Sequence, residues 1–405
     1  MRILWIDDVF WPHIRGGAEN RSYNLVQALA RTGHDVEVLT LRTIPVGPEH
    51  ENLSGTPIVR VESPQLPGCL WRIKPWLKMR QWHDVLRRFF RTRSYDGVIS
   101  SSTGIAHYTR RVKPRLASVV TTGGTWRGAK RYTFDRPQGG ISLRAGGEFA
   151  FWQFYVYEKL TYQAADFVVA ESKNVREQLV SLYHVNSRKI AVCHNGIDHE
   201  RFRPRNKERS GFRLREKWPA SAFVVISVGR VDRVKNYQYL IQAVSQTPRD
   251  ANIIAVIVGQ GPEQENLEAL CRELNVDDRV RFTGYRRDVH ELLAAADAFV
   301  LPSTFEAYGN VWAEALACGL PSMGLRRVPG KYYTAADEHI QHGQTGFLLA
   351  PEDPGDLAQR LVELAASPRA RKQMGRAGRE WALRTYTWDK TARQYAGLLH
   401  RCTAS

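Results

Sequence analysis

Two carboxylates, Glu306 and Glu314, bracket the start of a predicted helix. The strand AFVLPS comes before them, the turn contains Gly309 and Asn310, and an apolar helical stripe begins at Val311. In an open parallel sheet such a loop lies at the carboxyl ends of the strands, where ligands bind, and the amides at a helix start favour a phosphate. Carboxylates beside an anion site could bind sugar hydroxyls. The alternative is a solvated loop residue and a surface helical residue.

A basic pair with phosphate chemistry comes earlier in the chain. Gly229 and Arg230 follow a predicted strand, and Lys235 stands at the head of the next helix. An arginine fork and a lysine point charge can together neutralise a diphosphate. Tyr285 lies in another loop that follows a strand and a glycine. The strands predicted in this half run over residues 223–228, 253–258 and 280–283.

The chain opens with a strand, a helix and a strand. Gly16 and Gly17 start the helix, so that backbone amides could approach a phosphate or a sugar closely. An ordinary tight turn is the alternative. The strands predicted in this half run over residues 2–6, 36–41, 57–61, 97–100, 118–121, 167–170 and 190–193. This order predicts a doubly wound α/β sheet.

Two helical stretches have unusual faces. Residues 75–93 form a basic amphipathic helix, which is either a packing helix with a solvated basic side or a surface that docks on anionic lipid. In the second case Trp76 and Trp82 are expected at the interface. The stretch over residues 147–162 is apolar nearly all round, which predicts an interior helix.

Length, charge and cysteines limit the class of protein. A chain of 405 residues with 43% hydrophobic residues predicts two domains. It has neither a membrane-spanning apolar run nor a signal peptide, so we expect a cytoplasmic protein. The net charge of +17 lies mostly in the first half and indicates an anionic partner, a phosphorylated substrate or a membrane surface, since no nucleic-acid motif accompanies it. Five scattered cysteines argue against a zinc site.

The domain boundary is predicted near residue 203. Residues 201–218 are basic and irregular, which is typical of a linker. We therefore expect domains over residues 1–203 and 204–385. The helical segment 386–405 follows the second domain.

Nine motifs in order give the chain a resemblance to a known family. They are GGAE at Gly16, ADFVVAES at Ala165, HNGID at His194, SVGRVDRVKN at Ser227, VGQGP at Val258, FTGY at Phe282, the pair Glu306 and Glu314, ACGLP at Ala317 and QTGFLL at Gln344. The chain resembles a family 4 glycosyltransferase of the GT-B fold. The resemblance implies two Rossmann-like domains across a cleft, an acceptor domain followed by a donor domain, with segment 386–405 packed back on the first.

The resemblance also implies the chemistry. Such an enzyme moves a sugar from a nucleotide diphosphate sugar, with UDP favoured, to a glycan, lipid-linked or small-molecule acceptor. It retains the anomeric configuration and needs no metal or other cofactor. An anionic membrane surface at the inner face is a further candidate partner, and nucleic acid is not.

The family motifs assign roles residue by residue. Arg230 and Lys235 match the pair that holds the diphosphate, Glu306 matches the carboxylate at the transferred sugar, and Glu314 matches the ribose ligand. The remaining donor-binding positions, by the same resemblance, are Gly16, Gly17, Gly229, Tyr285, Gly309, Asn310 and Val311.

Two departures from the family stand out. Gly123 occupies the place where a histidine near the reacting sugar is expected, with His107 and His13 as candidate substitutes. Arg326, Arg327 and Lys331 lie where a short glycine-rich loop is usual. Gly123 motivates one alternative to a transferase, a non-catalytic homologue that binds the nucleotide sugar and serves as a partner or regulator. A GT-B epimerase that acts on the same donors is another.

Overall fold

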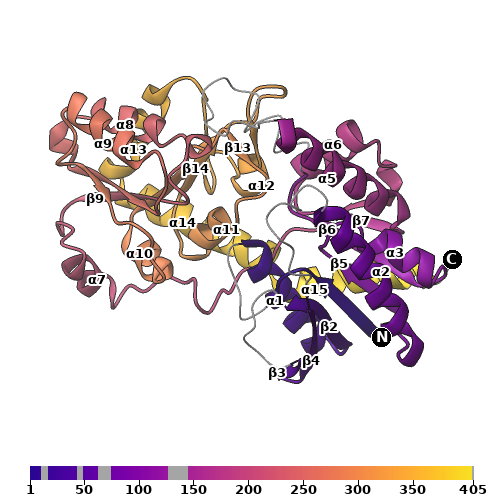
Figure 1. The fold of residues 1–405 in the computed structure, drawn as a ribbon. Coiled ribbons are helices and arrows are strands. Elements are labelled where there is room, and N and C mark those ends of the chain that lie inside the picture. Colours follow the sequence, from indigo (N-terminus) through magenta and orange to yellow (C-terminus); the bar gives the residue numbers. More distant parts are fainter. Residues whose placement is uncertain (11–16, 43–48, 63–73, 126–144, 404–405) are drawn as a thin grey trace. The chain divides into compact units, whose positions relative to one another are not determined.

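The chain folds into two compact units (Figure 1). The computed structural model describes residues 1–10, 17–42, 49–62, 74–125 and 145–403. Unit 1 comprises Met1–Gly196 and Trp388–Ser405, and unit 2 comprises Ile197–Thr387. The assignment of an acceptor and a donor domain stays a prediction.

Unit 1 is built on an eight-stranded sheet. In spatial order its strands are β3 (His50–Leu53), β4 (Thr56–Glu62), β2 (Asp35–Arg42), β1 (Arg2–Asp7), β5 (Gly97–Ser100), β6 (Ala117–Thr122), β7 (Phe167–Ala170) and β8 (Ile190–Val192). Neighbours are parallel except β3 and β4. The strands predicted from apolar runs are confirmed. The chain order reverses between β1 and β5, which makes this a topological switch point.

Helices pack on both faces of this sheet. They are α1 (Gly17–Arg31), α2 (Lys74–Thr92), α3 (Ile105–Val112), α5 (Ala145–Ala164), α6 (Lys173–Tyr183) and α15 (Trp388–Thr403). Successive side chains of a strand point to opposite faces. Ile3 and Trp5 accordingly join one buried cluster with α1 and α15, whereas Leu4 and Ile6 join another with α2 and α3.

The two unusual helical stretches are both helices, but their predicted surroundings are wrong in part. Trp82 of α2 is fully buried and its Nε1 donates to Asp8 Oδ1 at 3.2 Å, so this ring is not available to a membrane. The side chain of Trp76 lies outside the described residues. Trp152 of α5 is 59% exposed, which contradicts an interior helix at that position. Helix α5 packs on α3 and α2, and its Tyr155 and Tyr162 rings contact Tyr183 of α6.

Unit 2 is built on a six-stranded, fully parallel sheet. In spatial order its strands are β11 (Val280–Phe282), β10 (Ile253–Val258), β9 (Phe223–Val228), β12 (Ala298–Leu301), β14 (Ser322–Leu325) and β16 (Gly346–Leu349). Its helices are α7 (Arg209–Arg215), α8 (Tyr237–Ser245), α9 (Gln264–Glu273), α10 (Val289–Ala295), α11 (Asn310–Ala317), α12 (Ala336–His339), α13 (Pro354–Ala366) and α14 (Pro368–Thr385). The chain order reverses between β9 and β12.

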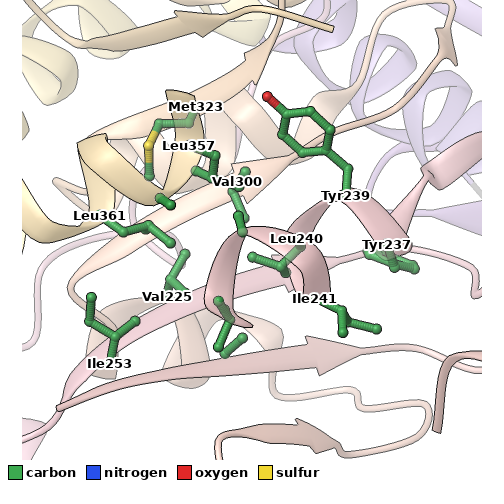
Figure 2. Close-up of a cluster of buried hydrophobic side chains, with 14 of the residues drawn as sticks. Val225, Tyr237, Tyr239, Leu240, Ile241, Ile253, Val300, Met323, Leu357 and Leu361 are labelled. Carbon is green, nitrogen blue, oxygen red and sulfur yellow. The ribbon is translucent and has the colours of Figure 1, made fainter. Parts of the chain in front are cut away.

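Each face of the second sheet has its own core. Figure 2 shows Val225 and Val300, from the neighbouring strands β9 and β12, beside Leu240 of α8 and Leu357 of α13. On the other face Trp312 of α11 packs in a cluster with residues of β9 and α10. Among the helices in the described ranges, none has the length and apolar character that crossing a bilayer requires.

The predicted linker over residues 201–218 is instead part of unit 2. It contains α7, whose Arg213 is buried and donates to Asp297, as does Arg209 at 2.7 Å. Burial raises the pKa of Asp297, but the two guanidiniums and the Val224 amide outweigh it and hold that pKa below its ordinary value. A buried charge with such partners is tightly fixed. The charges that resembled a solvated linker therefore attach this segment to the sheet.

Candidate functional site

The residues predicted for phosphate and sugar binding gather at the switch point of the second sheet. Gly229 and Arg230 follow β9, and Glu306 follows the adjacent strand β12. Ligands of open α/β sheets bind outside the carboxyl ends of strands at such a point. Two loops far apart in sequence thus reach the same edge of unit 2.

Glycines let the loops at this edge pack backbone against backbone. A Cβ on Gly259 would lie 1.9 Å from the carbonyl oxygen of Gly229, and one on Gly261 would lie 2.2 Å from that of Val231. The Val231 amide donates to the Gln260 carbonyl at 3.0 Å. The glycines of the predicted VGQGP motif therefore fix the loop that carries Arg230.

The basic pair is presented by a short turn after β9. The 3₁₀ helix η3 (Arg233–Lys235) is capped by Asp232, whose side chain accepts from the Lys235 amide at 3.3 Å. Arg230 is 74% exposed, and its Nε donates to the same carboxylate at 2.7 Å. Asp232 thus orders both members of the pair, a role that the sequence analysis missed. Its signal was a capping residue three positions before Lys235.

Lys235 and Glu306 form an ion pair, with Nζ against Oε2. Both side chains are more than four-fifths buried. Their backbones are tied as well, because the Thr304 amide donates to the Val234 carbonyl at 2.8 Å. The structure therefore brings together the carboxylate predicted at the transferred sugar and one of the two basic residues predicted to hold the diphosphate.

The helix after Glu306 begins at a glycine that no other residue could replace without strain. Gly309 has a φ of +81°, and a Cβ there would lie 2.6 Å from the Trp312 ring and 3.0 Å from Glu306 Cγ. The amides of Asn310 and Val311 belong to the first turn of α11, where no intrahelical acceptor exists. An anion beside Glu306 could use these amides.

Glu314 lies in α11 and is half-buried. Burial raises the pKa of its carboxyl to about 7, and Arg201 partly opposes the shift. The group therefore changes charge near neutral pH. A carboxylate of this kind gains most from a ligand that donates hydrogen bonds to it, such as a diol.

A buried histidine also supports the loop before α11. His339 Nε2 lies 3.0 Å from the Tyr308 carbonyl oxygen, and its ring packs against those of Tyr308, Trp312 and Tyr386. Nothing in the sequence pattern singled out this residue. His339 supports this loop through contacts between segments that lie far apart in the chain, and a sequence pattern does not reveal such contacts.

The other residues that the sequence predicted for the site belong to several different loops and helices. Tyr285 is 67% exposed in the loop after β11. Gly17 begins α1 in unit 1, and Gly16 and His13 lie outside the described residues. His107 is half-buried in α3, where burial lowers its pKa, and its ring packs against Tyr108.

Gly123, where a histidine was expected, lies next to a buried carboxylate. A Cβ at this position would lie 2.5 Å from Glu171 Oε1, so that the Glu171 side chain occupies the space that a residue 123 side chain would need. Glu171 is ion-paired with Arg21 of α1 and accepts from Asn195 Nδ2 at 2.9 Å. All three side chains are more than nine-tenths buried. At the carboxyl edge of the first sheet, the Glu171 side chain thus packs in the space that the absence of a side chain at Gly123 leaves.

No group of three or more His, Cys, Asp and Glu side chains in the described ranges is arranged to hold a metal ion. Independence of metal stays a prediction.

Comparisons with known proteins agree with this arrangement. Residues 15–201 match the family described as Glycosyltransferase Family 4, and residues 210–381 match Glycosyl transferases group 1. An uncharacterized glycosyltransferase of Methanocaldococcus jannaschii is 26% identical over 97% of this chain and 96% of its own length. The lipopolysaccharide core biosynthesis glycosyltransferase LpsE of Rhizobium meliloti is 26% identical over 95% of this chain and 96% of its own length.

The fold is shared with solved structures. Anabaena HepE in complex with UDP-glucose is similar with a TM-score of 0.72 and 20% identity, over 99% of this chain and 100% of that chain. At this level of identity the likeness shows the fold.

The close approach at Gly309 gives a testable prediction. Gly309→Ala should lower the free energy of unfolding by about 2 to 4 kcal/mol, because it adds overlap with Trp312 to an unfavourable φ. Gly343→Ala is the matched control, since Gly343 has a φ of +77° and nothing within 4 Å of a Cβ. It should cost only about 1 kcal/mol. Equal losses in urea unfolding would contradict the close-packing account.

Proposed function

The chain belongs to family 4 of the glycosyltransferases and has the GT-B fold, and from this premise we propose that it moves a hexose from a UDP-hexose to an acceptor hydroxyl, with retention of configuration and without a metal ion. The observation that carries the proposal is the Lys235–Glu306 pair at the switch point of the second sheet. A UDP-type donor is supported by the structure of HepE, which is a complex with UDP-glucose.

The proposed roles follow from charge and position. Breaking the bond between the sugar and the diphosphate leaves negative charge on the departing phosphate. Lys235, Arg230 and the first amides of α11 can compensate that charge in place of a metal ion. When the diphosphate engages Lys235, the Lys235–Glu306 ion pair opens and the Glu306 carboxylate can interact with the sugar.

The acceptor is proposed to be a saccharide or a lipid-linked glycan. The support is a relative, LpsE, whose name places it in lipopolysaccharide core biosynthesis. A carboxylate in the space beside Gly123 supplies a polar group at the carboxyl edge of unit 1. The non-catalytic alternative rests on Gly123, and the epimerase alternative rests on the use of the same donors. Neither is favoured, because the families and relatives that match this chain are glycosyltransferases.

Substitutions in the pair test the assignment of the active site. We expect Glu306→Gln to lower kcat at least about 100-fold with little change in donor affinity, because the carboxylate should contact the sugar most strongly in the transition state. Lys235→Ala and Arg230→Ala should weaken both donor binding and rate. Lys217→Ala, at an exposed lysine of the same unit, is the control.

The assay uses a panel of UDP-hexoses with saccharide and lipid-linked acceptors in the presence of EDTA. Product NMR would report the anomeric configuration. Wild-type turnover in the three variants would contradict the site. Activity that EDTA abolishes and manganese restores would contradict metal independence, and an inverted product would contradict retention.

The pKa of Glu314 predicts how UDP affinity depends on pH. If the ionised carboxylate accepts from the ribose hydroxyls, affinity should rise as pH increases through about 7 and level off near pH 8. At pH 6 about one tenth of the group is ionised, so affinity should be up to about tenfold lower. Ionisation of UDP itself acts on all variants alike. In calorimetric titrations, the UDP affinity of Glu314→Gln should therefore lack the rise from pH 6 to pH 8 that is assigned to Glu314. An identical pH profile in the wild-type protein and in Glu314→Gln would contradict the ribose role.

We also propose that a basic surface on α2 and α3 rests on anionic lipid. Its exposed residues are Arg87, Arg88, Arg91, Arg111, Lys113 and Arg115. Because the apolar side of α2 is buried, the attraction is electrostatic, at about 1 kcal/mol per basic residue.

Vesicle co-sedimentation tests the lipid surface. Binding should increase with phosphatidylglycerol content and fall with salt, and Arg87→Glu with Arg91→Glu should abolish it. Binding that ignores lipid charge, or no binding, would leave a soluble acceptor as the simpler account. Gln242→Ala, at an exposed and uncharged position of α8, is the control.

A further inference from the structure

Residues 326–334, part of the stretch that departs from the family pattern, lie against the strand that carries Glu306. The last two of them form β15 (Tyr333–Thr334), which pairs in parallel with β13 (Phe305–Glu306). These two strands make a sheet of their own, apart from the six-stranded sheet. We propose that this segment, here called the brace, is the positioning element that holds Glu306 opposite Lys235.

The inner contact of the brace is a short hydrogen-bond ladder. The Tyr333 amide donates to the Thr304 carbonyl at 3.0 Å, and the Thr304 amide donates to the Val234 carbonyl at 2.8 Å. The residue after Val234 is Lys235, and the strand after Thr304 carries Glu306. The backbone of the brace and the turn that carries Lys235 are therefore both hydrogen-bonded to Thr304, at the start of the Glu306 segment.

The outer contacts close a ring. Lys331 pairs with Glu352, and Tyr332 Oη donates to the same carboxylate at 3.3 Å. The loop that carries Glu352 is held in turn by Tyr239, whose hydroxyl lies 2.7 Å from the Ala350 carbonyl oxygen and 2.8 Å from that of Asp353. Tyr239 belongs to α8, the helix that starts just after Lys235 (Figure 2). These contacts therefore connect the brace, through Glu352 and Tyr239, back to the turn that carries Lys235.

The backbone ladder and the outer side-chain contacts at Glu352 do not contribute equally to the position of Glu306. Lys331 and Glu352 are both more than half exposed, and such pairs contribute little. The backbone ladder does not depend on salt or on long side chains. We therefore place the positioning effect in the Tyr333 amide and treat the outer pair as secondary.

The physical reason for a brace is the length of the paired side chains. Lysine and glutamate both lose much rotamer freedom when they are fixed, so a defined pair requires fixed backbones. A displacement of about 1 Å in a catalytic group can cost about 100-fold in rate. Strand β13 has two residues, and in the described ranges its strand partner is β15. Without the brace, Glu306 would remain on a loop.

Tyr333→Pro removes the amide that donates to Thr304. The matched control, Tyr333→Phe, keeps this amide and loses only the hydroxyl that accepts from the Gly330 amide. The readout is acetylation of Lys235 by an N-hydroxysuccinimide ester, followed by mass spectrometry and normalised to the exposed Lys217. We expect labelling of Lys235 to rise at least threefold in Tyr333→Pro and to stay at the wild-type level in Tyr333→Phe.

Activity provides a separate readout that rests on the proposed function. With a UDP-hexose donor, kcat should fall at least tenfold in Tyr333→Pro while the donor KM changes less than threefold. Unchanged Lys235 labelling in a folded Tyr333→Pro protein would overturn the brace whatever the activity. Raised labelling with full activity would support the brace and count against the catalytic roles of Lys235 and Glu306.

Hydrogen exchange in the wild-type protein tests the backbone hydrogen-bond ladder independently of any variant. The amides of Thr304 and Tyr333 should be protected to a similar degree, because one opening event exposes both. Exchange of the Tyr333 amide at the rate of an open loop would overturn the proposal.

Discussion

The ion pair between Lys235 and Glu306 is the interaction around which unit 2 is arranged. It requires two strand ends to be neighbours, and the reversal of chain order between β9 and β12 provides this. It also requires the two loops to approach closely, which side chains at Gly229, Gly259 or Gly309 would hinder. A largely buried pair of this kind contributes little net stability, since desolvation opposes the attraction. In the function proposed above, its role is to hold two charges ready for a ligand that separates them.

The requirement that the site residues follow the ends of neighbouring strands accounts for much of what the sequence predicts. The strands, their order along the chain and the residues at their carboxyl ends follow from apolar runs and glycine-containing loops, and the structure confirms them. These are local patterns. The proximity of Lys235 and Glu306 could be predicted because topology fixes which strand ends are adjacent.

What could not be predicted depends on contacts between distant segments. Trp82 has the spacing of an interfacial tryptophan, but Asp8 and the core around Leu4 bury it. The basic stretch before β9 resembles a linker until Asp297 is seen to bind Arg209 and Arg213. Likewise, the absence of a side chain at position 123 suggests a missing function, whereas the structure shows a space filled by Glu171 from the next strand. Composition and periodicity do not predict which distant residues will contact these side chains.

Unit 1 is discontinuous in sequence, and this affects its synthesis. Residues Tyr395 and Leu399 of α15 belong to the same buried cluster as Ile3 and Trp5, and Tyr395 Oη shares a hydrogen bond with Thr121 Oγ1 at 2.6 Å. During translation the first strands therefore leave the ribosome almost four hundred residues before the helix that completes their core. Domains usually fold in order from the N-terminus. Here unit 2 can be finished while unit 1 still exposes apolar surface, so that chaperone occupancy of the nascent chain should persist until its last turn of helix emerges.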